Sequence, residues 1–352
     1  MSASRQTTPA KLKKLDATVA ECKTLLIVVQ DYPDPDAIAS AAALREWAFR
    51  RHAIACTIGF GGVVGRMENR ALLNYLDLPI RHLHQLDPQQ FDAIALVDTQ
   101  PGTGNNALPP TVTPRIVIDH HPCRRATRQS AFTDIRRRYG ATSTILYEYL
   151  QASQLELSAP LATALLYGIR SDTQNLGRES GRADLEASLA LYRLANIRMV
   201  RLIEQANVPT SYFRLLSRAL LDARQCGSAF VSFPGVIETP DQIGEVAELL
   251  LRHEACDWAL CVGEFERRWL LSLRTSVTGA DAGTVMHRLV AGRGTGGGHR
   301  TMAGGQIPLP PESTPNQRAD MEKHLMKRLA RLTRQTGSAP YRALLDKESL
   351  TV

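Results

Sequence analysis

The sequence predicts an α/β fold with two domains, an N-terminal parallel-sheet domain and a smaller C-terminal α/β domain. In the first half of the chain, short apolar runs alternate with longer stretches of helical pattern, as in folds built on parallel sheets. The runs are continuously apolar rather than alternating, which is what strands covered on both faces require. A length of 352 residues is long for one core and suits two domains.

The N-terminal elements follow from this alternation. The strands are expected at residues 25–29, 53–58, 93–97 and 116–118. Helices are expected between them at 37–50 and 67–76. From Gly140 onward the pattern becomes mostly helical, with helices expected at 161–169, 184–194 and 199–205.

The second half of the chain begins at a break in composition near residues 225–227. Further elements are expected after it, namely strands at 228–233, 258–263 and 270–273 and helices at 241–251 and 316–335. The glycine-rich segment 292–307 lies between them and is expected to be a loop. We therefore divide the chain into a flexible tail (1–20), a first domain (21–200), a helical connector (201–226), a second domain (227–335) and a C-terminal tail (336–352).

Composition and charge narrow the classes of protein. The hydrophobic fraction of 44% and charged fraction of 22% are ordinary for a globular protein, and the net charge of +7 favours anionic partners. None of the six cysteines forms a C-x-x-C pair, so we expect reduced thiols and no cysteine-bound zinc. The first apolar run, 25–29, is too short for a signal-peptide core, and no run approaches the roughly 20 residues of a membrane span. We expect a cytoplasmic protein with no membrane association.

Acidic and histidine clusters follow the apolar segments. Asp34 and Asp36 come after the first expected strand, Asp98 after the third and Asp119–His121 after the fourth, while Asp172 ends a helix. In parallel sheets, ligands bind outside the carboxyl ends of the strands, so these side chains are expected to converge. Carboxylates with imidazoles suit Mn²⁺, Mg²⁺ or Zn²⁺, and a carboxylate that bridges two such ions makes a two-metal hydrolase.

Each cluster by itself has a plainer interpretation. Asp36 could simply cap the following helix, and Asp98 and Asp172 could be turn residues. It is the occurrence of all the clusters in one chain, in this order, that favours a shared site.

These motifs resemble the four signature motifs of the DHH phosphoesterases, and GTGGGHRTMAGG resembles the glycine-histidine motif of their DHH-associated C-terminal domain. The resemblance extends from about Thr24 to Ile307 and is greatest with the oligoribonuclease and pAp phosphatase (nano-RNase) branch. It implies a catalytic first domain, a substrate-binding second domain and an active site in the cleft between them. It also implies two divalent cations, usually Mn²⁺, with Mg²⁺ as the alternative.

The resemblance assigns a role to each motif residue. The five implied metal ligands are Asp34 for one ion, Asp36 for the other, Asp98 as the bridge, and His120 and Asp172 to complete the second site.

Two further residues are implied to be catalytic. His121 would face the scissile phosphate and Asp119 would orient the histidines, so that water attacks phosphorus in line between two ions. The first motif departs from the family, because Gln30 stands where most members have a histidine ligand. An amide oxygen is a weaker ligand for Mn²⁺ than imidazole, so we expect weaker binding at the first site or a preference for Mg²⁺.

Substrate contacts are expected in both domains. The candidates are Arg274, Gly297, Gly298 and His299 in the second domain and Arg66 and Asn69 in the first. Glycines let a backbone approach a phosphate closely, and arginine pairs with phosphate through two hydrogen bonds. The alternatives are a flexible connector for the glycine segment, a solvent-facing charge for Arg274, and a simple turn for the segment around Arg66.

The expected activity is hydrolysis of phosphoester bonds in short oligonucleotides, in 3′-phosphoadenosine 5′-phosphate (pAp), or in both. One alternative is pyrophosphatase or exopolyphosphatase activity, because the first-domain motifs are shared across the superfamily. Another is a nucleotide-binding regulator weakened by Gln30. The expected partners are short oligonucleotides or phosphorylated nucleotides as substrates, and a homodimer is possible.

Overall fold

The computed structural model describes residues 7–178, 180–298, 300–310, 314–334 and 341–345. The chain forms two compact units, residues 1–207 and 208–352, and each is considered by itself. Both are mixed α/β structures, so the predicted fold class is confirmed.

The described part of unit 1 contains a six-stranded, fully parallel sheet. Its strands are β1 (Thr24–Val28), β2 (Ala55–Phe60), β3 (Ile80–His82), β4 (Ala93–Val97), β5 (Ile116–Asp119) and β6 (Phe132–Ile135), in the spatial order β3-β2-β1-β4-β5-β6. The sequence analysis found the four inner strands and missed both edge strands.

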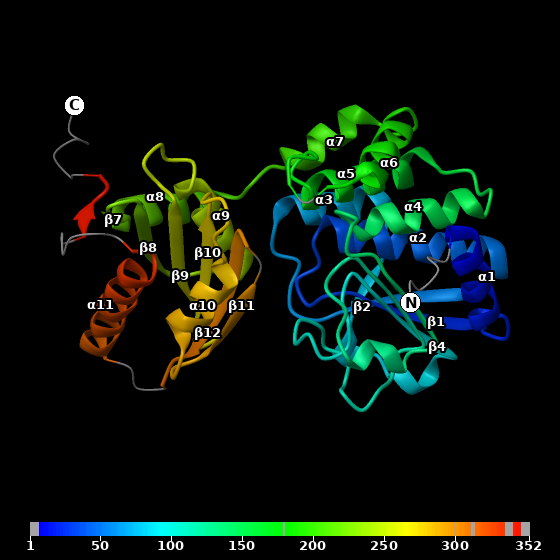
Figure 1. Cartoon of the computed structure of the whole chain (residues 1–352), viewed down its shortest axis with the longest axis horizontal. Coiled ribbons are helices and arrows are strands. Elements are labelled where there is room, and N and C mark those ends of the chain that lie inside the picture. The colour runs from blue at the N-terminus through cyan, green and yellow to red at the C-terminus, as the bar shows by residue number, and fades with distance from the viewer. Residues whose placement is uncertain (1–6, 179, 299, 311–313, 335–340, 346–352) are drawn as a thin grey trace. The chain divides into compact units, whose positions relative to one another are not determined.

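Both faces of this sheet are buried. Along β1, Leu25 and Ile27 enter the large core cluster, while Leu26 and Val28 enter a smaller one together with Leu83. This alternation is the two-residue period of a strand. The helices of the unit are α1 (Thr8–Val19), α2 (Pro35–His52), α3 (Met67–Leu76), α4 (Thr142–Ala152), α5 (Ala159–Asp172), α6 (Arg182–Tyr192) and α7 (Ile197–Glu204). The helix α2 packs against both α4 and α5 over one face of the sheet (Figure 1).

The strand order reverses direction between β1 and β4. In open α/β sheets a ligand binds at such a switch point, outside the carboxyl ends of the strands. Asp34 follows the carboxyl end of β1 and Asp98 follows that of β4. The topology therefore brings two predicted metal ligands to the place where this architecture binds ligands.

Unit 2 is built on a mixed sheet in the order β11-β12-β10-β9-β8-β7-β13. The strands are β7 (Arg224–Cys226), β8 (Ala229–Val236), β9 (Trp258–Phe265), β10 (Arg268–Thr275), β11 (Thr295–Gly298), β12 (Met302–Pro308) and β13 (Arg342–Ala343). The helices are α8 (Thr210–Asp222), α9 (Asp241–Leu250), α10 (Ala282–Val290) and α11 (Pro315–Leu332). Apolar residues of α10 and α11 join one core cluster, and those of α8 and α9 join another.

Three segments differ from the expectations. Residues 8–19, expected within a flexible tail, form α1 and bury Leu12, Leu15 and Val19. The glycine-rich segment forms the paired strands β11 and β12 rather than a loop. Residues 342–343 of the expected C-terminal tail pair with β7. Tertiary packing overrides the local pattern in each case.

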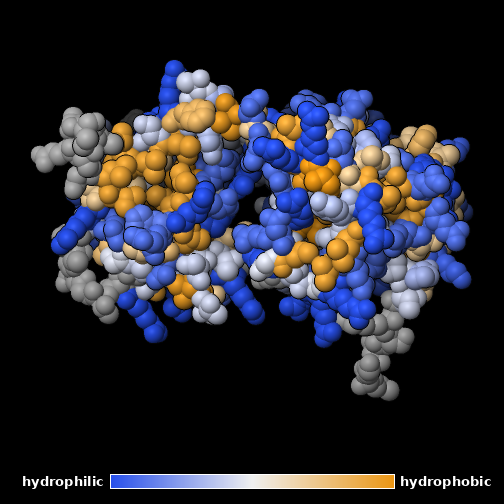
Figure 2. All heavy atoms as spheres, turned by 90° about the horizontal axis from the view of Figure 1, so that it is seen from above, coloured by the Kyte–Doolittle hydropathy of each residue, from blue (hydrophilic) through white to orange (hydrophobic). Residues whose placement is uncertain are grey.

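The face shown in Figure 2 carries hydrophilic side chains with hydrophobic patches among them. Among the described residues, there is no helix with the length and apolar character needed to cross a bilayer.

Candidate metal centre

The two aspartates of the first motif have different environments at the start of α2. Asp34 caps the helix, because its Oδ1 accepts a hydrogen bond from the amide of Ala37 at 2.9 Å. Asp36 is fully buried and accepts hydrogen bonds from the amides of Thr142 and Ser143, each at 2.7 Å. Capping, which we had considered for Asp36, is thus the role of Asp34. The Asp36 carboxylate instead lies at the N-terminus of α4, where the positive end of the helix dipole stabilises its negative charge.

Asp98 lies immediately after β4 in a left-handed conformation, with φ of 59°. Such a conformation is unfavourable for most residues with a side chain, and it recurs at functional sites. The side chain is almost completely buried, and its Oδ1 accepts a hydrogen bond from Thr142 Oγ1 at 2.9 Å. The backbone therefore holds a buried carboxylate at the switch point.

His120 follows β5, and its two ring nitrogens have different neighbours. Nδ1 lies 3.2 Å from the carbonyl oxygen of Tyr139, which fits a proton on Nδ1. In the neutral ring, Nε2 would then carry the lone pair. It lies 3.2 Å from Asp172 Oδ2 and 3.6 Å from Asp98 Oδ1. This arrangement leaves Nε2 in the orientation that metal-binding histidines use.

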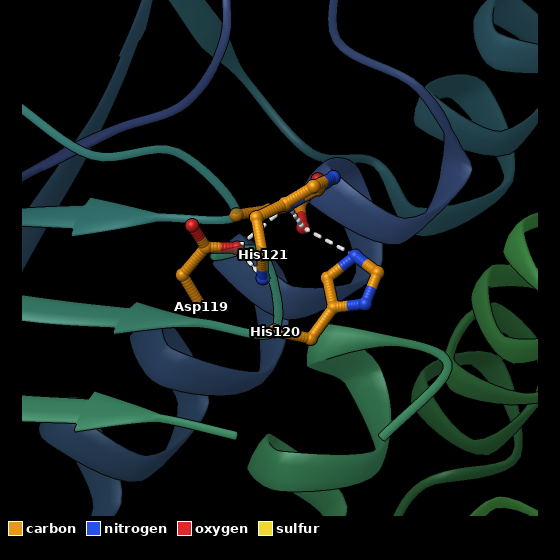
Figure 3. Close-up of side chains that lie close together, drawn as sticks. Asp119, His120 and His121 are labelled. Atoms are coloured by element: carbon orange, nitrogen blue, oxygen red, sulfur yellow. Dashed lines mark hydrogen bonds and ion pairs between the residues drawn. The ribbon is translucent and has the colours of Figure 1, made fainter. Parts of the chain in front are cut away.

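Asp119 and His121 form a second pair at the end of β5 (Figure 3). Asp119 Oδ1 lies 2.8 Å from His121 Nδ1 and accepts a hydrogen bond from the His121 amide at 3.1 Å. Its Oδ2 accepts a hydrogen bond from Gln100 Nε2 at 2.6 Å. A fully buried Gln100 thus fixes Asp119, and Asp119 fixes the His121 ring.

The predicted residues fall into two overlapping groups. The ligand atoms of Asp36, His120 and Asp172 all lie within 4.8 Å of one another. The same limit holds for the group of Asp98, Asp119, His120 and His121.

Asp34 belongs to neither group, although Asp172 and Asp36 are near enough to influence its ionisation. Its Oδ2 accepts a hydrogen bond from Gln30 Nε2 at 2.7 Å. Gln30 therefore lies beside Asp34, and its role as a metal ligand stays a prediction.

The carboxyl groups of this site are costly to ionise together. Burial, followed by the charges of Asp172 and Asp36, raises the pKa of Asp34 to about 7. Burial also raises the pKa of Asp36, and it raises the pKa of Asp98 well above its usual range with help from Asp36 and Asp34.

His120 shows the opposite balance. Burial by itself would lower its pKa, but Asp172 and the other acids prevail and raise it to about 10. The negative potential of the surrounding carboxylates therefore favours a bound proton or cation in this site.

A divalent cation fits this environment. The Nε2 atom of His120 is buried and makes no well-aligned hydrogen bond within the described part of the chain. A cation beside it would supply the positive charge that lets the surrounding carboxylates ionise. Carboxylate oxygens suit Mn²⁺ and Mg²⁺, and an imidazole beside them favours Mn²⁺ or Zn²⁺ over Mg²⁺.

Several positioning residues escaped the sequence analysis. Gln100 and the carbonyl of Tyr139 orient His121 and His120, as described above. Asp184 is fully buried and accepts hydrogen bonds from the Gly140 amide and from Thr144 Oγ1, so it fixes the turn that leads into α4. No motif signals such residues, because their role depends on burial and on partners distant in sequence.

The expected substrate contacts of unit 2 have other partners here. Arg274 lies beside Glu248 of α9, with its Nη2 3.2 Å from Glu248 Oε1. Gly297 and Gly298 lie in β11, the last strand of the sheet order, where one strand edge faces β12. His299 lies outside the described residues. Substrate binding by these residues stays a prediction.

The expected contacts of unit 1 lie at the start of α3. Arg66 is its half-buried N-cap residue. Asn69 is buried and donates a hydrogen bond from Nδ2 to the carbonyl oxygen of Pro33 at 3.0 Å. Asn69 therefore supports the loop that carries Asp34, a positioning role that we had not expected for it.

Replacing Gly168 by alanine is expected to disturb the site from within the core. The added Cβ would lie 2.6 Å from Ser143 Oγ and 3.2 Å from the carbonyl oxygen of Pro35. Such overpacking costs about 1–3 kcal/mol, so thermal denaturation should show a midpoint several degrees lower, with weaker Mn²⁺ binding. Gly297→Ala is the control, because its Cβ meets no atom within 4 Å. Equal midpoints for the two variants would contradict this packing argument.

Comparison with known domain families gives two matches. The model of the DHH family N-terminal domain matches residues 25–169. The model of the DHHA1 domain matches residues 227–330.

Two relatives of known sequence are similar to the chain. An uncharacterized protein of Methanocaldococcus jannaschii is 33% identical over 298 residues, covering 84% of this chain and 60% of that protein. An A-adding tRNA nucleotidyltransferase of Geobacter sulfurreducens is 30% identical over 244 residues, covering 65% of this chain. The chain spans 60% of the length of the first relative and 27% of the second.

Solved structures share the fold at low sequence identity. An exopolyphosphatase-related protein from Bacteroides fragilis has a TM-score of 0.72 and 15% identity, covering 94% of this chain and 100% of its own. RecJ from Thermus thermophilus, in complex with Mn²⁺, has a TM-score of 0.52 and 14% identity, covering 91% of this chain and 55% of its own. These likenesses concern the fold.

Proposed function

The chain carries the two domains of the DHH/DHHA1 phosphoesterase superfamily, and we propose that it is a divalent-metal-dependent hydrolase of phosphoester bonds in short oligonucleotides or in pAp. One observation carries the proposal. Three carboxylates and one imidazole from separate stretches of unit 1 (Asp36, Asp98, Asp172 and His120) converge in one largely buried site.

Each residue of the site has a task in this chemistry. Asp34, Asp36, Asp98, His120 and Asp172 would hold two divalent cations, Mn²⁺ or Mg²⁺. Bound there, the cations would activate water and neutralise charge on the phosphate.

The other residues act on the substrate or on the ligands. His121 is more exposed than His120, with 37% of its side chain accessible against 13%, so it is the ring better placed to meet a phosphate oxygen. Asp119 holds its orientation from one side, and the Tyr139 carbonyl does the same for His120.

The nucleotide part of the substrate is supported by charge and by the second domain. The net charge of +7 favours anionic partners. One relative is named as an A-adding tRNA nucleotidyltransferase, a protein that acts on a nucleic acid, and this favours a nucleotide substrate here too. We propose that unit 2 binds the nucleotide end of the substrate, with Arg274 exchanging its contact with Glu248 for a phosphate.

The proposal is tested by a substrate panel with each divalent metal. We expect the purified protein to release mononucleotides from RNA of two to five nucleotides, or phosphate from pAp, when Mn²⁺ or Mg²⁺ is present and not when EDTA is added. Hydrolysis of pyrophosphate or polyphosphate with no action on nucleotides would instead favour the alternative activity. That alternative has one observation in its favour, the shared fold of the exopolyphosphatase-related protein.

Replacing Gln30 by histidine is expected to strengthen metal binding. Gln30 already contacts Asp34, so an imidazole there would add a nitrogen donor beside that carboxylate. Titration calorimetry with Mn²⁺ should show a dissociation constant lower by roughly tenfold, with higher activity at limiting Mn²⁺.

Gln30→Ala is the matched variant, which removes the contact without adding a donor. A different result would be a wild-type protein that binds pAp but hydrolyses no substrate, with hydrolysis restored in Gln30→His. That result would favour the alternative of a nucleotide-binding regulator whose catalysis is weakened by Gln30. An unchanged dissociation constant in Gln30→His would contradict a metal-facing position for residue 30.

A further inference from the structure

A cluster of basic side chains, separate from the acidic metal centre, lies in unit 1 at the end of the edge strand β6. A cavity of about 910 Å³ opens there, lined by residues of three elements: the start of α1, the segment after β6 and the start of α6. Its volume lies within the usual range of ligand sites. Its lining includes five basic residues: Lys11, Arg136, Arg137, Arg138 and Arg182.

Part of this charge is compensated within the protein. Lys11 and Arg136 both pair with the buried Asp134, and Arg136 also pairs with Glu148. Arg182 pairs with Glu186 on the surface of α6. The pairs of the buried Asp134 hold Lys11 and Arg136 in place, whereas the Arg182 pair is exposed to solvent.

Arg137 and Arg138 remain as two exposed cations with no acidic partner among the described residues. The start of α1 adds to this positive potential. Thr7 and Thr8 line the cavity, Thr7 makes no side-chain capping bond, and the first turn of the helix holds no acidic residue. A helix start favours anions through its free amides, although Pro9 in this first turn has no N–H to offer. The exposed arginines are therefore the main attraction for phosphate, and the helix start adds to them.

The cavity also lies close to the metal centre along the chain and in the sheet. Tyr139 lines it, and the carbonyl of the same residue faces Nδ1 of His120 at 3.2 Å. The strand β6 neighbours β5, which carries the histidines, and neighbouring strands lie about 4.8 Å apart. Tyr139 thus belongs both to the lining of the cavity and to the surroundings of His120.

We propose that the cavity binds the phosphate backbone of a single-stranded oligonucleotide beyond the nucleotide that is cleaved. Arg137 and Arg138 would contact backbone phosphates, so that affinity increases with the length of the strand. This inference rests on the proposed function for its choice of substrate, and its test measures binding without turnover.

The experiment is fluorescence anisotropy with labelled RNA of two and of five nucleotides, in EDTA. The wild-type protein should bind the longer strand more tightly. In Arg137→Ala/Arg138→Ala the ratio between the two affinities should fall by about tenfold or more, because two charge-assisted contacts are lost. The slope of log affinity against log salt should decrease by about 1.4, as expected for two phosphate contacts on a single strand.

Two further double variants distinguish binding at this cavity from a general effect of net charge on affinity. Arg193→Ala/Arg198→Ala removes the same charge from exposed positions of unit 1 outside the cavity lining, and should leave the ratio unchanged. Arg137→Lys/Arg138→Lys keeps the charge and should retain most of the preference for the longer strand. An equal loss in both alanine pairs, or a wild-type protein without length preference, would overturn the proposal. An inactive protein that shows the length preference would refute the proposed hydrolysis and leave this site standing.

Discussion

Replacing Asp98 by asparagine is expected to lower kcat by about a thousandfold or more. The carboxylate lies 3.6 Å from Nε2 of His120, the residue that the two metal-ligand groups share. Its loss removes several kcal/mol of charge stabilisation, about 1.4 kcal/mol for each factor of ten. Asparagine tolerates the left-handed conformation at this position and can still accept the hydrogen bond from Thr142. The substitution therefore tests the charge rather than the backbone.

The measurement is kcat for a dinucleotide together with the Mn²⁺ stoichiometry from calorimetry. We expect both to fall in Asp98→Asn. Asp77→Asn is the matched control, since Asp77 is also left-handed, with φ of 46°, but caps the exposed end of α3. Activity within a few-fold of wild type in Asp98→Asn would rule out the bridging role.

Replacing Asp119 by asparagine is expected to lower kcat by about 10–100-fold, the usual effect of removing a group that orients metal-site histidines. Asp119 is almost completely buried, and the hydrogen bond from His121 holds its pKa below the usual value although burial works against ionisation. An amide cannot supply this charge. His121 would then lose its fixed tautomer and orientation.

Gln100 offers an independent check of the same contact. Gln100→Leu should give a smaller loss, and the double variant should be no worse than Asp119→Asn by itself, because both act on one chain of hydrogen bonds. The measurement is a double-mutant cycle on kcat. Additive losses would show that Gln100 does not act through Asp119.

The sequence predicted the inner strands of unit 1 well and its edges poorly. The run 93–97 coincides with β4, because a strand buried on both faces is continuously apolar. The edge strand β6 contains Thr133 and Asp134 and has no such pattern. The helix α1 was missed for a similar reason, since its buried Leu12 and Leu15 are separated by lysines.

The glycine-rich segment was mispredicted because glycine is rare in strands. Here Gly296 and Gly305 pack against Met286 of α10, where an added Cβ would lie 2.8 Å and 2.6 Å from its atoms. The segment is a pair of strands that a helix approaches closely. A local pattern cannot reveal this, because the helix that requires the glycines lies elsewhere in the sequence.

The predicted ligands come together in unit 1 because strand ends in a parallel sheet share an edge. Asp98 and His120 illustrate this, since each directly follows an apolar strand, while Asp172 reaches the site from the end of helix α5. The supporting residues could not be predicted in the same way. Gln100 and Asp184 have ordinary sequence surroundings, and their hydrogen bonds span 19 and 44 residues of chain.

The most direct test of the metal centre is anomalous diffraction at the manganese edge, from crystals of the protein soaked in Mn²⁺. We expect two peaks in unit 1, both within bonding distance of the Asp98 carboxylate, with His120 Nε2 and Asp172 bound to one of them. Peaks away from Asp98, or no ordered Mn²⁺ among these side chains, would contradict the account.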